Sequence, residues 1–248
     1  MSYALIEMAW PEVGRALARD PRLILPVGAL DQHGPHLPLA TNIHIVEHVV
    51  REVSERLSVL RAPVFAYGTT QSGGPYAGKA GLRRKTLHRA VNELLAHWED
   101  DGVAEFVIIT AHRYEPHLEA LLMALTDSAL NSVYDLYQID VSDLVTEDPE
   151  TEHGGELETS LMMHLEPDLV RVDQIRDFRL EPSELRKYTR GRVPAPPTES
   201  CGVIGRPTLA SPDKGAAIFE RYITALTSAL RGDPVGGSEP RTGTTQPV

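Results

Sequence analysis

The stretch RLILPVGALDQHGPHLPLATNIHIVEHVVREVSERL, residues 22–57, contains one complete strand–loop–helix unit. Its first part, Arg22–Val27, is an apolar run that is typical of a buried strand. Apolar side chains then recur at helical spacing over 43–57, and Asn42 is placed to cap the start of that helix. A strand that leads through a short loop into a helix is the repeating unit of parallel α/β sheets, so this stretch predicts that class of fold.

The same alternation continues along the rest of the chain. Further strands are predicted at 62–67, 105–110 and 132–139, and further helices at 8–17, 86–100, 116–130, 155–165 and 215–230. We therefore expect an α/β fold, a three-layer α/β/α sandwich with a mainly parallel central sheet. Residues 1–231 are predicted to form a single domain. The tail 232–248 has almost no large apolar side chain and is predicted to be disordered.

Charge and composition exclude several classes of protein. The formal net charge of −11 argues against a nucleic-acid partner, which would require a basic face. No apolar stretch approaches the roughly 20 residues of a membrane span, and the N-terminus has no secretory signal pattern. The single cysteine, Cys201, fits a reducing compartment and is interpreted as structural. These features predict a cytoplasmic protein with a small-molecule substrate.

Polar residues gather at the points where predicted strands end. Asp31 and His33 follow the first strand, His112 follows the third, and the adjacent pair Glu152-His153 follows the fourth and its loop. The carboxyl ends of parallel strands meet at one edge of a sheet, where ligands bind. Carboxylates and imidazoles bind divalent transition metals, and a Glu–His pair beside a metal suits proton transfer. The pattern therefore predicts a metal site.

Each of these groups also has an ordinary structural interpretation. Loop histidines can hydrogen-bond to backbone, and Glu158 can be a first-turn acid stabilised by the helix dipole. His117 can be a solvent-facing residue of its helix. Among the other histidines of the opening stretch, His36 is expected to support the ligands and His48 to lie on the helix surface, while the role of His44 stays open.

Three segments together resemble the creatininase (creatinine amidohydrolase) family. They are LPVGALDQHGPHLPL at 25–39, EHGGELETSLMMHLEPDLV at 152–170 and GVIGRPTLASPDKG at 202–215. Their order and spacing agree with the family over roughly residues 20–230. The resemblance implies a parallel-sheet α/β sandwich, usually assembled as a hexamer, and so a homo-oligomer.

The resemblance also implies roles for individual residues. The metal ligands would be Asp31, His33, Asn42, His112 and Glu158, and the catalytic residues Glu152 and His153. The cofactor would be one or two divalent metal ions per chain, Zn or Mn, with Fe as a further candidate.

The sequence departs from the family pattern at several of these positions. Asp31 replaces the usual Glu, and Asn42 replaces the Asp that bridges two metals, which leaves such a centre one negative charge short. Arg113, Glu115 and Lys79 stand in segments that differ from the family and are predicted to contact substrate. No Trp precedes the Glu-His-Gly-Gly motif, so creatinine is not the expected substrate.

The predicted function is a metal-dependent hydrolase that cleaves an amide or cyclic-amide C–N bond of a small polar molecule. Glu152 would accept a proton from water, and His153 would polarise the carbonyl or protonate the leaving nitrogen. Two alternatives stay open. The scaffold could instead hydrolyse a lactone or an activated C–C bond, or the chain could be a metal-poor, non-catalytic member that serves ligand binding or assembly.

Overall fold

The structure is a computed structural model that describes residues 2–71, 75–124, 126–149, 152–190 and 196–232. Within these segments the sheet has four parallel strands in the order β2-β1-β3-β4. The strands are β1 Arg22–Val27, β2 Leu60–Arg61, β3 Glu105–Thr110 and β4 Leu130–Asp135. The helices are α1 Trp10–Leu17, α2 Thr41–Leu57, α3 Arg84–Asp100, α4 Glu115–Leu122, α5 Glu156–Leu165, α6 Pro182–Thr189 and α7 Pro212–Arg231. Short 3-10 helices lie at Leu5–Glu7, Leu136–Gln138, Pro167–Leu169, Val172–Gln174, Thr198–Ser200 and Pro207–Leu209.

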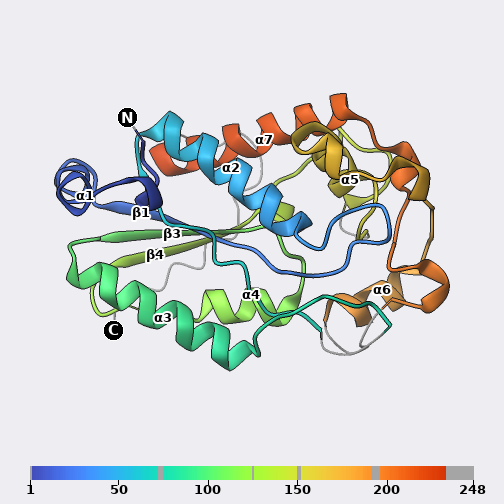
Figure 1. Cartoon of the computed structure of the whole chain (residues 1–248), viewed down its shortest axis with the longest axis horizontal. Helices are drawn as coiled ribbons and strands as arrows, with labels where there is room; N and C mark the ends of the chain where they lie inside the picture. Colours follow the sequence, from blue (N-terminus) through green and yellow to red (C-terminus); the bar gives the residue numbers. More distant parts are fainter. Residues whose placement is uncertain (1, 72–74, 125, 150–151, 191–195, 233–248) are drawn as a thin grey trace.

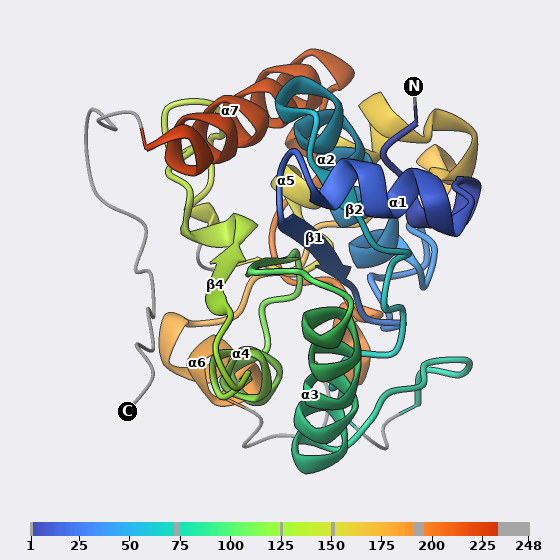
Figure 2. The same cartoon turned by 90° about the vertical axis from the view of Figure 1, so that its left-hand side faces the viewer.

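Helices cover both faces of the sheet (Figures 1 and 2). Successive strand residues point to opposite faces, so Ile24 and Val107 pack with α2, α5 and α7, whereas Leu25 and Ile108 pack with α1, α3 and α4. Both layers are fully apolar at their centres, which is what a buried parallel sheet requires. The predicted three-layer α/β/α sandwich with a mainly parallel sheet is confirmed.

The second strand is shorter and earlier than predicted. It spans Leu60–Arg61, and the predicted range 62–67 continues beside β1 with single hydrogen bonds. Ala62 N donates to Ile24 O and Phe65 N donates to Pro26 O. The two donors are three residues apart while their acceptors are two apart, so the regular register is lost between them.

The helix predicted at 116–130 ends at residue 122 in the structure, so the prediction was wrong beyond that residue. Instead of continuing α4, the chain turns so that the backbone amides of Asp127, Ser128 and Ala129 donate to the carboxylate of Glu99 at the end of α3. β4 consequently begins at Leu130. A carboxylate that satisfies three amides competes with helix formation, and it lies too far away in sequence for periodicity to reveal it.

Other expectations have different outcomes. Asn42 does not cap α2, because the helix begins at Thr41 and Ala40 is its N-cap residue. Helix α6 was not among the predicted helices. The predicted disordered tail lies outside the described residues except for Gly232, and the single-domain boundary stays a prediction. No helix in the described segments is long and apolar enough to cross a membrane.

Candidate metal centre

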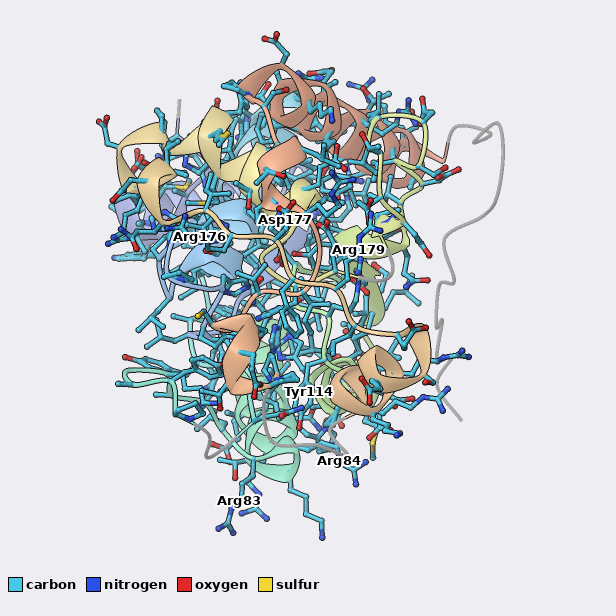
Figure 3. All side chains as sticks on the ribbon, turned by 90° about the vertical axis from the view of Figure 1, so that its right-hand side faces the viewer. Arg83, Arg84, Tyr114, Arg176, Asp177 and Arg179 are labelled. Atoms are coloured by element: carbon cyan, nitrogen blue, oxygen red, sulfur yellow. The ribbon has the colours of Figure 1, made fainter. Side chains whose placement is uncertain are left out.

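Six polar residues meet at the carboxyl edge of the sheet, and we call them the central cluster: Asp31, His33, Asn42, His112, His153 and Glu158. The loop after β1 and the residues after β3 supply three of them. Gly28 lets α2 pack closely on the first loop, since a Cβ there would lie 2.8 Å from Ile43 Cγ1. Figure 3 views the molecule from this end, where Tyr114 lies between the labelled arginines.

Asn42 lies between two imidazoles of the central cluster. Its Oδ1 is 3.2 Å from His33 Nε2, and its Nδ2 is 2.9 Å from His112 Nδ1. This is the position in which the resemblance implies a bridging carboxylate. A carboxamide is neutral, so a two-metal centre built here has one negative charge fewer than one with Asp.

Asp31 and His112 form one half of the cluster. His112 Nε2 donates to the carbonyl oxygen of Thr69 at 2.9 Å, so the lone pair is on Nδ1, the nitrogen that faces Asn42. Asp31 accepts a hydrogen bond from the hydroxyl of Thr70. Burial opposes ionisation of Asp31, but the charges of neighbouring histidines and this hydrogen bond outweigh it and lower its pKa.

His33, His153 and Glu158 form the other half. One ligand atom from each lies within 4.8 Å of the other two, and the two imidazole rings are 4.5 Å apart. Glu158 accepts hydrogen bonds from Gly154 N and the Tyr137 hydroxyl, which holds its carboxylate facing His33 Nε2 at 3.6 Å. Burial opposes both charges, yet their mutual attraction raises the pKa of His33 and lowers that of Glu158.

The donor set of the central cluster fits a divalent transition metal. Two carboxylates and three imidazoles are the oxygen and nitrogen donors that such ions take in proteins. The pairs Asp31–His112 and His33–Glu158 lie on either side of Asn42. This arrangement fits one metal-ion position on each side of Asn42. Asp31, His33, His112 and Glu158 are each oriented by a second hydrogen bond, from backbone or from a hydroxyl, as metal ligands usually are.

Glu152 is hydrogen-bonded to the backbone of the helix that carries Glu158. Its Oε1 accepts a hydrogen bond from Leu157 N at 2.8 Å, so it caps the start of α5, and Oε2 packs against Gly155, where a Cβ would be 2.4 Å away. Burial, together with the charge of Glu158, raises the pKa of Glu152 to about 8. A carboxyl that is protonated at neutral pH is poorly suited to accept a proton from water.

Two residues predicted to contact substrate have partners within the protein. Arg113 does not stand free at the rim: its guanidinium lies 4.4 Å over the ring of Tyr137, and it donates to the carbonyl oxygen of Pro149. Glu115 is exposed on α4 and faces Arg190 at 3.8 Å.

The inward residue at this position is Tyr114. Its ring centre lies 5.9 Å from that of His112, and burial together with the Asp31 charge raises the pKa of its phenol. Lys79, the third predicted substrate contact, is half-buried and precedes Ala80, whose amide donates to Leu30 O in the loop that carries Asp31.

The remaining histidines separate into inner and outer groups. His36 is buried with Nε2 2.9 Å from Thr159 Oγ1, consistent with a supporting position. His117 is not solvent-facing as predicted: it is buried, and its Nδ1 accepts from Thr69 N at 3.1 Å, because α4 turns this face onto the sheet. His44 and His48 lie outside the central cluster, beside Glu166. Cys201 is exposed.

Sequence reasoning missed Thr70, Tyr114 and Tyr137. Tyr137 lies two residues after β4, inside the range 132–139 that was predicted as a strand, so the strand end was placed too late to reveal it. Thr70 follows the interrupted second strand, whose end was misplaced. Nothing in the sequence distinguishes Tyr114 from Glu115.

Together, the fold and the cluster define a parallel α/β protein with a candidate metal centre at the carboxyl edge of its sheet. The family model described as "Creatininase: Creatinine amidohydrolase" matches residues 6–230. The chain therefore belongs to the creatininase family, and the resemblance inferred from its three motifs is confirmed.

Several characterised proteins are similar along nearly the whole chain. A creatinine amidohydrolase of Pseudomonas putida is 30% identical over 253 residues, covering 91% of this chain and 95% of that protein. A mycofactocin precursor peptide peptidase of Mycobacterium tuberculosis is 29% identical over 223 residues, covering 82% of each. These relatives are amide-bond hydrolases, so the family is one of C–N hydrolases.

Solved structures show the same fold. A creatininase variant of the "Zn-Zn type" has a TM-score of 0.78 and 24% identity, covering 94% of this chain and 98% of that one. A structure titled "Creatininase Mn" has a TM-score of 0.76, again at 24% identity and with 94% and 98% covered. At this identity the likeness establishes the fold alone.

Replacing Asn42 by Asp is expected to raise the metal content of the protein. The new carboxylate would lie between His33 and His112 and add a negative charge shared by both halves of the cluster, so the weaker ion should bind about tenfold or more tightly. Metal analysis after dialysis against a series of free Zn²⁺ concentrations measures this. The control Asn92→Asp adds the same charge on α3, and an Asn42→Asp protein with unchanged metal binding would contradict the bridging position.

Proposed function

We propose that this chain is a metal-dependent hydrolase that cleaves an amide or cyclic-amide C–N bond of a small polar molecule. The observation that carries the proposal is the convergence of three imidazoles and two carboxylates at the carboxyl edge of the sheet. Membership of a family whose named relatives are an amidohydrolase and peptidases supports the same reaction class. Under the metal-poor alternative, this buried set of charged groups would have no ion to bind.

The donor set favours Zn or Mn, with Fe as a further candidate, bound as one or two ions per chain. When bound, such an ion polarises the substrate carbonyl and lowers the pKa of the attacking water. Asp31 and His112 would hold the first ion, and His33 and Glu158 the second. Because Asn42 brings no charge, we propose that the second ion binds more weakly.

We propose that His153 transfers the proton. Burial lowers the pKa of its imidazole to about 4, so the ring is neutral at pH 7 and can accept a proton from water. Its Nε2 lies 2.6 Å from the carbonyl oxygen of Gln32, an arrangement that positions the ring. The same ring can then protonate the leaving nitrogen.

Glu152, the proton acceptor expected from the sequence, is proposed instead to position the site. It accepts from Leu157 N and thereby orients the first turn of α5, which carries Glu158. The oxygen that accepts from Leu157 N is already engaged, which makes Glu152 a weaker candidate base than His153. The Glu152→Gln variant keeps an oxygen for the Leu157 amide, so this role predicts only a modest loss of turnover.

Creatinine is not the proposed substrate, because no Trp stands at 147–151. Tyr114 and Lys79 are the proposed substrate contacts. Tyr114 lies beside His112, the histidine after β3, and Lys79 lies beside the loop that carries Asp31. We further propose a cytoplasmic homo-oligomer, a hexamer by resemblance, with no nucleic-acid or membrane partner, in keeping with the net charge of −11.

A substrate panel tests this function. The protein, loaded with Zn²⁺ or Mn²⁺ and analysed for metal content, is assayed with cyclic amides, formamides, short peptides, lactones and cyclic ketones. We expect turnover of one of the C–N classes. Turnover of lactones or ketones alone would favour the repurposed scaffold, and no turnover at full metal occupancy would contradict the proposal. A protein that fails to retain metal supports the non-catalytic alternative.

A further inference from the structure

We propose that His44, His48 and Glu166 form a second divalent-metal site, the outer site, separate from the central cluster. His44 and His48 lie one turn apart on α2, and residues at this spacing share a helix face. Glu166 comes from the end of α5, 118 residues away in sequence from His48. Two imidazoles at i and i+4 on a helix plus a carboxylate from elsewhere are an established zinc ligand set.

Both imidazoles approach the same carboxylate oxygen. Glu166 Oε1 lies 2.8 Å from His48 Nε2 and 3.7 Å from His44 Nδ1. Ligand atoms held at about 2.0–2.1 Å from a tetrahedral Zn²⁺ lie about 3.3 Å apart, so both contacts with Glu166 are near that value, whereas the two imidazoles are farther apart, since the three ligand atoms do not all lie within 4.8 Å of one another. Side-chain rotation that brings the imidazoles toward each other completes the geometry, and these side chains have the freedom to rotate because they are only partly buried.

The outer site is reached from solvent without passing the central cluster. The side chains of His44, His48 and Glu166 are 27%, 18% and 34% exposed, whereas Asn42, two residues before His44, is buried on the opposite side of α2. An ion held here would tie the first turns of α2 to the end of α5. Those two helices carry Asn42 and Glu158, so the outer ion would stabilise the frame of the central cluster without touching it.

Arg51 competes with a metal for this site. Its Nη2 lies 2.6 Å from His48 Nδ1 and donates to it, which leaves the proton of His48 on Nε2, where it donates to Glu166. A metal at Nε2 requires that proton to move to Nδ1, and Arg51 must then withdraw. Arg51 is exposed, so it can leave, but its charge also repels the incoming cation.

Equilibrium dialysis with Zn²⁺ tests the outer site in the full chain. We expect the unmodified protein to bind one more ion than the double variant His44→Ala/His48→Ala. Arg51→Ala should bind that ion about fivefold more tightly, because a repelling charge is gone. The control His97→Ala removes an exposed histidine on α3 and should leave the number of ions unchanged.

The outcomes separate the outer site from the central cluster. In a His33→Ala protein the central metal should weaken while the outer ion still binds, and amide hydrolysis by His44→Ala/His48→Ala should equal that of the unmodified protein at saturating central metal. Equal zinc content with and without the two outer histidines, or no tightening in Arg51→Ala, would overturn the proposal. If the double variant is unstable, Glu166→Gln removes the shared oxygen and is measured in its place.

Discussion

Removing the metal is expected to lower kcat/KM for the amide substrate by about 10³-fold or more, since the ion supplies several kcal/mol of transition-state stabilisation. The protein's own side chains cannot replace it. Asp31 and Glu158 are acceptors, and the buried His112 donates to Thr69 rather than toward a substrate. His33, whose pKa is raised, faces Glu158 at 3.6 Å, so a positive charge on its imidazole is already paired and does not serve a substrate carbonyl.

The measurement is turnover after dialysis against a chelator, followed by addition of Zn²⁺ or Mn²⁺ in measured amounts. Activity should return in proportion to the metal regained. Glu158→Gln is a useful companion, because the amide keeps the size of the side chain but loses the charge that faces His33 at 3.6 Å. A metal-free protein that hydrolyses amides at the original rate would exclude the proposed mechanism.

Replacing His153 by Gln is expected to lower kcat by about 10²–10⁴-fold, the usual contribution of a positioned acid–base group. KM should change little, because the proposed role is proton transfer rather than substrate binding. Metal content should fall only slightly if Asp31, His112, His33 and Glu158 are the main ligands. Loss of metal in proportion to activity would instead make His153 a ligand.

The comparison with Glu152→Gln decides which residue transfers the proton. If His153 is the acceptor, Glu152→Gln should retain most of its turnover, whereas a larger loss in Glu152→Gln would restore the expectation drawn from the sequence. The pH profile gives an independent check. With its pKa lowered to about 4, the His153 imidazole is neutral above that pH and can accept a proton. The activity that it supports should therefore be lost as the pH falls through about 4.

Much of the metal centre could be predicted from the amino-acid sequence because several of its residues follow the ends of predicted strands. Asp31, His33 and His112 were expected at one sheet edge from their positions after buried strands, and the structure brings them together there. The family resemblance implied a place for Asn42 between two metals, and Asn42 lies between His33 and His112. The carboxyl ends of parallel strands meet at one sheet edge whatever their separation in sequence, so this part of the site follows from the order of the elements.

Side-chain direction after a strand end could not be predicted in the same way. Arg113, Tyr114 and Glu115 are consecutive, and only packing decides that Arg113 stacks on Tyr137, Tyr114 turns toward His112 and Glu115 faces outward. Likewise, the sequence motif that contains Glu152 and His153 does not reveal that one caps a helix while the other faces His33.

By itself the sequence determined the α/β class, the family and the strand ends that carry the ligands, because apolar periodicity and motif spacing are local properties of the chain. The resemblance implied that His33 and Glu158 belong to one centre, but only the tertiary structure decided that Glu158 faces His33 directly and that Glu166 meets His44 and His48. Those contacts depend on how α2 and α5 pack on the sheet. The same packing, by burying charged groups together, shifts the pKa values that distinguish His153 from Glu152.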